Sequence, residues 1–222
     1  MSKLIDLTHV IDPATVQRKF SLEIIGAETV NKNVVRLEDQ WYIMSNINMV
    51  SHIGTHIESP YHILPEGKDL SKLPLEMLCG NAVMLDLTDL PAKSAITEES
   101  VKIAAEKAGG IRKGDIVLCN LGYADFYNTD RYDDSPYFTT EAINFLVRSG
   151  MKLMGIDASG VEIPWSEEHV NHLALLSNDI PLLENMANLN AVGATRFKLY
   201  AFPISVTGLE SFPLRVVAEV AE

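Results

Sequence analysis

Three of the six histidines in this 222-residue chain lie in one short segment, HIGTHIESPYH, at positions 52–62. The segment also contains a glutamate, and its polar positions 52, 56, 58 and 62 are all even-numbered. In an extended chain, alternate side chains point to the same face, so these four would share one face. Imidazole nitrogens and a carboxylate oxygen form a ligand set for Zn²⁺ or a neighbouring first-row ion. The spacing predicts a metal site that includes His52, His56 and Glu58.

The backbone of this segment must bend if its side chains are to meet at one ion. A straight strand would hold His52 and His56 about 13 Å apart, whereas metal–nitrogen bonds are about 2.0–2.1 Å long. A helix is disfavoured because Gly54 and Pro60 both lie inside the segment. Gly54 is where a bend costs least, and its missing side chain is expected to leave room for an ion and a water. A hydrogen-bonded polar turn without metal is the alternative that the spacing leaves open.

Length and composition limit the class of protein. A chain of 222 residues with 47% hydrophobic and 22% charged residues predicts one compact domain over residues 1–222. A net charge of -12 disfavours a nucleic-acid partner, because neutralising phosphates requires clustered Lys and Arg. No apolar run approaches the roughly 18 residues of a membrane span, and the N-terminus lacks an apolar leader. Cys79 and Cys119 are too few for a disulfide scaffold and are expected to be reduced core positions. We expect a cytoplasmic protein that acts on a small molecule.

The elements that must position the motif alternate between strand and helix in the middle of the chain. Residues 4–62 hold short β-type runs, which indicate hairpins, and no helical pattern. The order that follows, β-α-β-α-β, predicts an α/β fold with a mixed, partly barrel-like sheet and flanking helices. The expected strands are 81–87, 114–123, 151–157, 197–204 and 214–220, and the expected helices are 98–108 after the N-cap Thr97, 139–150, and 166–177 with Ser166 as N-cap.

Two further polar residues stand out in the second half of the chain. In the expected helix 166–177, His169, His172, Leu173 and Leu176 fall on one face, so His172 is predicted to point toward the core. Glu184 lies in the apolar sequence PLLENM. A carboxylate there either faces inward or lies on the outside of an amphipathic turn, and the sequence leaves both open.

The motif resembles HxGTHxDxPxH of the cyclase family of metal-dependent hydrolases, which includes bacterial kynurenine formamidases and isatin hydrolases. Similarity extends over nearly the whole chain, through RKGDIVLCNLGY and SPYFTTEAINFLVRSGMKLMGID to FPI and SFPLR. The resemblance implies a swivelling β/β/α-like fold, one or two divalent ions (Zn²⁺ or Mn²⁺) and a homo-oligomer, either dimer or tetramer. By position it implies that His52, His56 and Glu58 bind the first ion, that Glu58 bridges, that His172 and Glu184 bind the second, and that His62 is the catalytic acid/base.

The resemblance also implies a reaction. A metal-activated water would cleave an amide, cyclic imide or lactone bond of a small molecule, most like an arylformamidase of the N-formylkynurenine type. A ring-opening enzyme of the isatin-hydrolase type is one alternative, and a catalytically weak metal- or ligand-binding protein on the same fold is another. A serine nucleophile is disfavoured because the sequence has no G-x-S-x-G motif.

Three departures from the family pattern bear on the substrate. Glu58 and Glu162 each stand where relatives tend to carry Asp, which is one methylene shorter. Residues 12–24, DPATVQRKFSLEI, replace a tryptophan-proline-glycine stretch that contributes to the substrate pocket in relatives. Family membership therefore does not fix which bond is cut. His9 is expected to make a structural hydrogen bond near the site, and His169 to cap its helix or face solvent.

Overall fold

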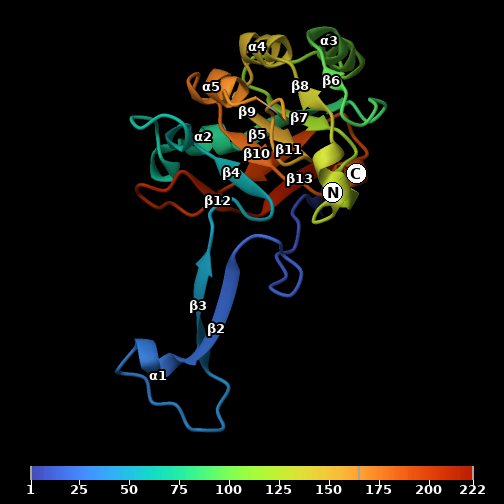
Figure 1. Ribbon diagram of the computed structural model, residues 1–222. Helices are drawn as coiled ribbons and strands as arrows, with labels where there is room; N and C mark the ends of the chain where they lie inside the picture. The colour runs from blue at the N-terminus through green and yellow to red at the C-terminus, as the bar shows by residue number, and fades with distance from the viewer. Residues whose placement is uncertain (1, 165, 222) are drawn as a thin grey trace.

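The computed structural model describes residues 2–164 and 166–221. Helices and short 3-10 turns are interspersed among the strands along the chain, and the chain ends in successive strands (Figure 1). The strands are β1 (Ser2–Asp6), β2 (Phe20–Gly26), β3 (Ile43–Met49), β4 (His56–Glu58), β5 (Cys79–Asp86), β6 (Ala95–Ile96), β7 (Ile116–Asn120), β8 (Tyr137–Phe138), β9 (Leu153–Ile156), β10 (Leu182–Glu184), β11 (Arg196–Ala201), β12 (Ser211–Pro213) and β13 (Val216–Ala221). The helices are α1 (Ala27–Val30), α2 (Leu75–Leu78), α3 (Glu98–Lys107), α4 (Thr140–Arg148) and α5 (Val170–Leu176).

A nine-stranded mixed sheet forms the centre of the molecule, in the order β1-β13-β11-β5-β7-β9-β10-β4-β12. The strands β5, β7, β9 and β10 run parallel to their neighbours within this group, and antiparallel strands extend the sheet at both ends. The sheet is strongly curled into a half-barrel, with α3, α4 and α5 grouped on one side of it (Figure 1). The expected α/β class and partly barrel-like sheet are confirmed.

Both faces of the central strands are buried, because each face packs against a separate hydrophobic cluster. Along β7, Val117 and Cys119 belong to the cluster that includes α3 and α4, whereas Ile116 and Leu118 belong to the cluster on the opposite face. Alternate side chains of a strand point to opposite faces, so a strand covered on both sides is apolar throughout. None of the described helices is long and apolar enough to cross a membrane.

The capping residues account for two of the helices. Thr97 accepts a hydrogen bond from the backbone N–H of Ser100, whose hydroxyl accepts one from the backbone N–H of Thr97, so a reciprocal capping box begins α3. The Thr139 hydroxyl caps α4 by accepting a hydrogen bond from the backbone N–H of Ala142. The helices end close to glycines with positive φ at positions 109 and 150. These boundaries confirm the elements expected at 98–108 and 139–150.

Several expectations about the other elements were wrong. Helix α5 begins at Val170 after His169, because the Ser166 hydroxyl is used in a local turn with the backbone of Glu168. Leu173 is exposed, so it does not share the inward face of His172. Cys79 is only partly buried, although Cys119 is buried and both thiols are free. Within residues 4–62, β1 and β4 pair with distant strands, and the one-turn helix α1 lies between β2 and β3.

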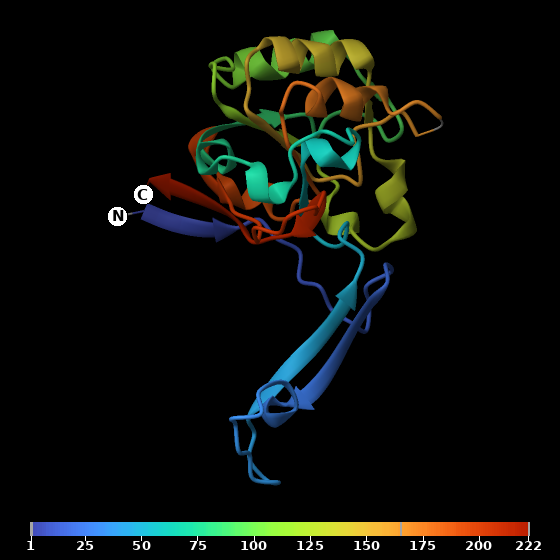
Figure 2. The same cartoon turned by 90° about the vertical axis from the view of Figure 1, so that its left-hand side faces the viewer.

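Strands β2 and β3 form a two-stranded hairpin that extends away from the rest of the molecule (Figures 1 and 2). We call residues 20–49 the arm and the remaining described residues the body. Neither of the two hydrophobic clusters contains a residue of the arm. The core of the body is therefore complete without it.

We predict that Gly54→Ala destabilises the protein. Gly54 has φ of 60°, and an added Cβ would lie 2.8 Å from Cγ1 of Ile11. The left-handed backbone costs a non-glycine residue about 1–2 kcal/mol, and the contact with Ile11 adds to this. The matched control is Gly193→Ala, because Gly193 has φ of 62° and no atom within 4 Å of the added Cβ. Denaturant unfolding should show a larger loss of unfolding free energy for Gly54→Ala, and equal losses would contradict the close packing at this turn.

Candidate metal centre

Strand β4 carries two of the motif residues into the interior. It lies between β10 and β12, and within it His56 and Glu58 share one face while Ile57 packs in the core on the other. The β4–β10 register sets His56 directly opposite Glu184. All three polar residues of this group are buried, with relative exposures of 1%, 2% and 5%. Glu184 therefore faces inward, which resolves the two orientations that the sequence left open.

A bend at Gly54 returns His52 toward Glu58. The positive φ of Gly54 confirms the expected bend, and the backbone around it is held by Asn185 and Thr55. The side-chain amide of Asn185 donates to the Gly54 carbonyl over 3.1 Å, and the Thr55 hydroxyl donates to the Asn185 carbonyl. The space left by the missing Gly54 side chain is occupied by Ile11, so it does not serve as room for an ion.

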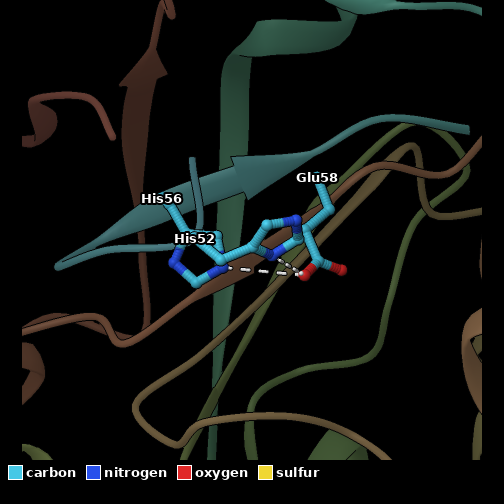
Figure 3. A group of neighbouring side chains, drawn as sticks. All are labelled: His52, His56 and Glu58. Carbon is cyan, nitrogen blue, oxygen red and sulfur yellow. Dashed lines mark ion pairs between the residues drawn. The ribbon is translucent and has the colours of Figure 1, made fainter. Parts of the chain in front are cut away.

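The six residues predicted from the motif and the resemblance lie together around the Glu58 carboxylate. Oε1 of Glu58 lies 2.9 Å from Nδ1 of His52 and 3.6 Å from Nε2 of His56 (Figure 3). Oε2 of Glu58 lies 3.3 Å from Nε2 of His172. Glu184 completes the group, with its two oxygens 3.5 Å from Nε2 of His56 and 3.6 Å from Nε2 of His172. The two oxygens of Glu58 thus face different histidines, as a bridging carboxylate requires.

Two hydrogen bonds orient the buried imidazoles. Nδ1 of His56 lies 2.9 Å from the Gly54 carbonyl, so this nitrogen is assigned the proton and donates it. Nδ1 of His172 lies 2.9 Å from Oε1 of Glu162, which also accepts the backbone N–H of His172. Each ring therefore presents an unprotonated Nε2 to the other donor atoms when it is neutral. A carboxylate or carbonyl behind the ring is the usual support of a metal-binding histidine.

The donor set fits a divalent metal ion. Nε2 of His56, Oε2 of Glu58 and Oε1 of Glu184 are buried and have no hydrogen-bond partner among the described residues. Ligand atoms that surround an ion tetrahedrally at 2.0–2.1 Å lie about 3.3–3.4 Å from one another, close to the spacings found here. Buried polar atoms without partners are costly, and a bound cation would satisfy all three.

When no metal cation is bound, protonated imidazoles balance the negative charge of the carboxylates. Burial raises the pKa of Glu58, but the adjacent imidazoles of His172, His52 and His56 outweigh burial and hold that pKa well below its usual range. Burial lowers the pKa of His172, but Glu162, Glu184 and Glu58 together raise it to about 12. The carboxylates therefore demand positive charge at this point. A divalent ion supplies that charge and competes with protons for the same nitrogens.

His62 lies at the open side of the cluster. Its Nε2 is 3.9 Å from Oε1 of Glu58, and 33% of its side chain is exposed. Burial lowers the pKa of His62 most, the negative charge of Glu58 raises it, and the neighbouring His52 and His172 lower it again. The net shift leaves the ring neutral at pH 7. One nitrogen of His62 also lies close enough to Glu58 and His172 for the three to hold an ion, so the geometry permits either a base or a ligand.

A cavity of about 410 Å³ opens onto these side chains. Sequence reasoning missed Arg18 on its wall and Glu210 behind His52. Nε2 of His52 lies 3.4 Å from Oε1 of Glu210, and the Ser51 hydroxyl donates to the same oxygen. Nothing in the local sequence marks Glu210, because the β4–β12 pairing alone brings it here. The cavity is lined by Arg18, His52, Glu58, His62, Ile63, Ser159, His169, His172 and Glu184.

The two remaining histidines lie around the cluster. The His9 ring stacks on Tyr127 with 4.1 Å between centroids, and it is the His9 backbone N–H, not the ring, that donates to Thr55. His169 occupies the N-cap position of α5 without a side-chain capping hydrogen bond. Its ring centroid is 6.4 Å from that of His172, on the wall of the cavity.

Comparison with known proteins agrees with this geometry. Kynurenine formamidase of Salinibacter ruber is 26% identical over 216 residues, 96% of each chain. The structure of isatin hydrolase A from Labrenzia aggregata bound to benzyl benzoate superposes with a TM-score of 0.82 at 25% identity, covering 100% of this chain and 94% of that one. The structure of a potential metal-dependent hydrolase with cyclase activity superposes with a TM-score of 0.76 at 24% identity, and the match covers 100% of both chains. Residues 5–163 match the Cyclase family, and the chain belongs to that family.

Proposed function

We propose that the protein is a metal-dependent hydrolase that cleaves an amide, cyclic imide or lactone bond of a small molecule. The observation that carries the proposal is the convergence of three buried, unpartnered donor atoms from His56, Glu58 and Glu184 beneath a cavity. We assign His52, His56 and Glu58 to one ion position and His172 with Glu184 to a second, and Glu58 is the residue placed to bridge them. Zn²⁺ and Mn²⁺ both accept this set of imidazoles and carboxylates.

A divalent ion in this place lowers the pKa of a bound water toward 7 and polarises a carbonyl group. The residues of the chain orient the metal-binding imidazoles and transfer the proton. Glu162 keeps the Nδ1 proton of His172, so that Nε2 faces the site. His62 is neutral at pH 7 and stands at the cavity, so it accepts the proton of the attacking water and returns it to the leaving nitrogen or oxygen.

The substrate we favour is an aryl formamide of the N-formylkynurenine type, because the kynurenine formamidase of Salinibacter ruber matches nearly the full chain. The second candidate is the ring opening of a cyclic amide, favoured by the similarity to isatin hydrolase structures. Turnover of matched linear formamides, cyclic imides and lactones by metal-reconstituted protein distinguishes the two. A protein that binds metal and turns over none of them would be the non-catalytic binding protein.

Arg18 favours substrates with an anionic group. It lies in residues 12–24, where this chain departs from its relatives, and on the wall of the cavity beside His52 and His62. No carboxylate among the described residues forms an ion pair with it. We propose that its guanidinium binds a carboxylate carried by the substrate next to the scissile bond. We further propose that the protein works in the cytoplasm, where its free thiols stay reduced, and as a homo-oligomer.

Glu58→Gln is expected to lose metal affinity strongly, because an amide oxygen replaces the anionic oxygen between the histidines. Glu58→Asp should retain at least one ion with altered occupancy of the other, since the charge remains. Elemental analysis after dialysis against a graded series of chelator concentrations measures both. Glu76→Gln, on the exposed surface, is the control. Wild-type affinity in Glu58→Gln would place the carboxylate outside the metal site.

His62→Ala is expected to keep its metal and to lose about 10²–10⁴-fold in kcat. The lowered pKa of His62 also sets a pH dependence. A base must be unprotonated, so kcat/KM of the wild type should fall only when the pH drops below about 6.5, and His62→Ala should lack this limb. Metal content and the rate profile are measured on the same preparation. An inactive variant that has lost its metal would show that His62 is a ligand.

Arg18→Gln is expected to lower kcat/KM about 10–100-fold for a substrate with a carboxylate, chiefly through KM, because a charge-assisted hydrogen bond contributes about 1.5–3 kcal/mol. The matched carboxamide substrate should be affected little. Arg112→Gln, at a residue that lines a different cavity, controls for the change in net charge. Equal losses on the two substrates would remove the role in anion binding while leaving the hydrolase activity in place.

A further inference from the structure

His52 differs from the two buried imidazoles of the cluster in the ring nitrogen that it presents to Glu58. His56 and His172 each turn Nε2 toward the Glu58 carboxylate and place Nδ1 against a supporting oxygen behind the ring. His52 is reversed, because its Nδ1 lies 2.9 Å from Oε1 of Glu58 (Figure 3). The supporting oxygen for His52 must therefore lie at its Nε2.

Glu210 provides an oxygen at that position, since its Oε1 lies 3.4 Å from Nε2 of His52. Glu58 and Glu210 thus contact different nitrogens of one imidazole. The separation from Glu210 is longer than most hydrogen bonds. A ring that binds a cation through Nδ1 is a stronger N–H donor at Nε2, and its hydrogen bond to a carboxylate is charge-assisted. Glu210 stands to His52 as Glu162 stands to His172.

Two sets of contacts hold Glu210 in this place. The Ser51 hydroxyl donates to Oε1, the same oxygen that faces His52. The backbone carbonyl of Glu210 accepts the backbone N–H of Ser59 over 2.8 Å and the Ser59 hydroxyl over 2.9 Å. A carboxylate that is already fixed by its side chain and its backbone loses little conformational entropy when it supports a neighbouring ring. The contact with His52 is therefore preorganised.

We propose that Glu210 is a positioning residue of the metal centre, which accepts the Nε2 proton of His52 and so directs the unprotonated Nδ1 toward the ion position at Glu58. The opposite tautomer would place an N–H group there and leave no lone pair for a cation. Support matters more for His52 than for His56, because 20% of the His52 side chain is exposed against 1% for His56, so packing restrains it less. The inference rests on the metal binding of the proposed function, but not on which bond is cleaved.

Metal affinity tests the proposal without any measurement of turnover. Zinc content after dialysis against graded chelator concentrations should show about 10–100-fold weaker binding in Glu210→Leu than in the wild type. Glu210→Gln retains an acceptor oxygen, so its loss should be smaller. The matched control is Glu219→Leu, because Glu219 is also partly buried, accepts a hydrogen bond from the Tyr200 hydroxyl and lines a different cavity. Cooperative unfolding of the metal-free leucine variants shows that both are folded.

Long-range proton–nitrogen NMR correlation spectra of the zinc-loaded wild type report which ring nitrogen carries the proton, with no change at Glu210. His52, identified by the signals that His52→Gln lacks, should be protonated at Nε2, whereas His56 and His172 should be protonated at Nδ1. A His52 ring protonated at Nδ1 would overturn the proposal, as would wild-type zinc affinity in Glu210→Leu. A wild type that binds no zinc would overturn the metal centre of the proposed function and the role of Glu210 with it, so the two failures are distinguishable.

Discussion

The structure depends on one constraint, which is that two buried carboxylates, Glu58 of β4 and Glu184 of β10, share the same two histidines. Glu58 and Glu184 are both nearly inaccessible to water, and each lies within 3.6 Å of Nε2 of His172. Bringing such charges out of water costs several kcal/mol per ion unless positive charge accompanies them. Protonated imidazoles or a divalent cation can supply it. The arrangement is therefore unfavourable as packing alone and is explained by the cation that it would bind.

The local fold brings the histidines close to these two buried carboxylates. The three-residue strand β4 is inserted between β10 and β12, which fixes the direction of His56 and Glu58. The left-handed turn at Gly54 returns His52 to the same centre, and the Asn185 amide holds that turn. Glu162 orients His172 from behind. Glu58 and Glu162 lie against opposite nitrogens of the His172 ring, so both carboxylates act on the same imidazole.

The sequence was most informative where local chemistry decides the outcome. Alternation and the N-cap residue Thr97 located strands and helices, and the motif located four of the clustered side chains. The start of α5 was missed because the Ser166 hydroxyl serves a turn instead of a cap. Glu210 could not be found, since only the β4–β12 pairing brings it beside His52, and the sequence marked the segment that contains Arg18 but not that residue itself. Hairpins were expected near the N-terminus. The periodicity of a sequence does not determine whether such a hairpin packs against the body of the same chain or extends away from it. A single domain over residues 1–222 stays a prediction.

The central claim is that a divalent ion binds where the buried donor atoms of His56, Glu58, His172 and Glu184 converge. Anomalous diffraction from crystals of catalytically active protein, recorded on either side of the zinc and manganese absorption edges, tests it most directly. The account predicts an anomalous peak about 2.0–2.2 Å from Nε2 of His56 and from a carboxylate oxygen of Glu58. Active protein whose crystals show no peak among these side chains would contradict it.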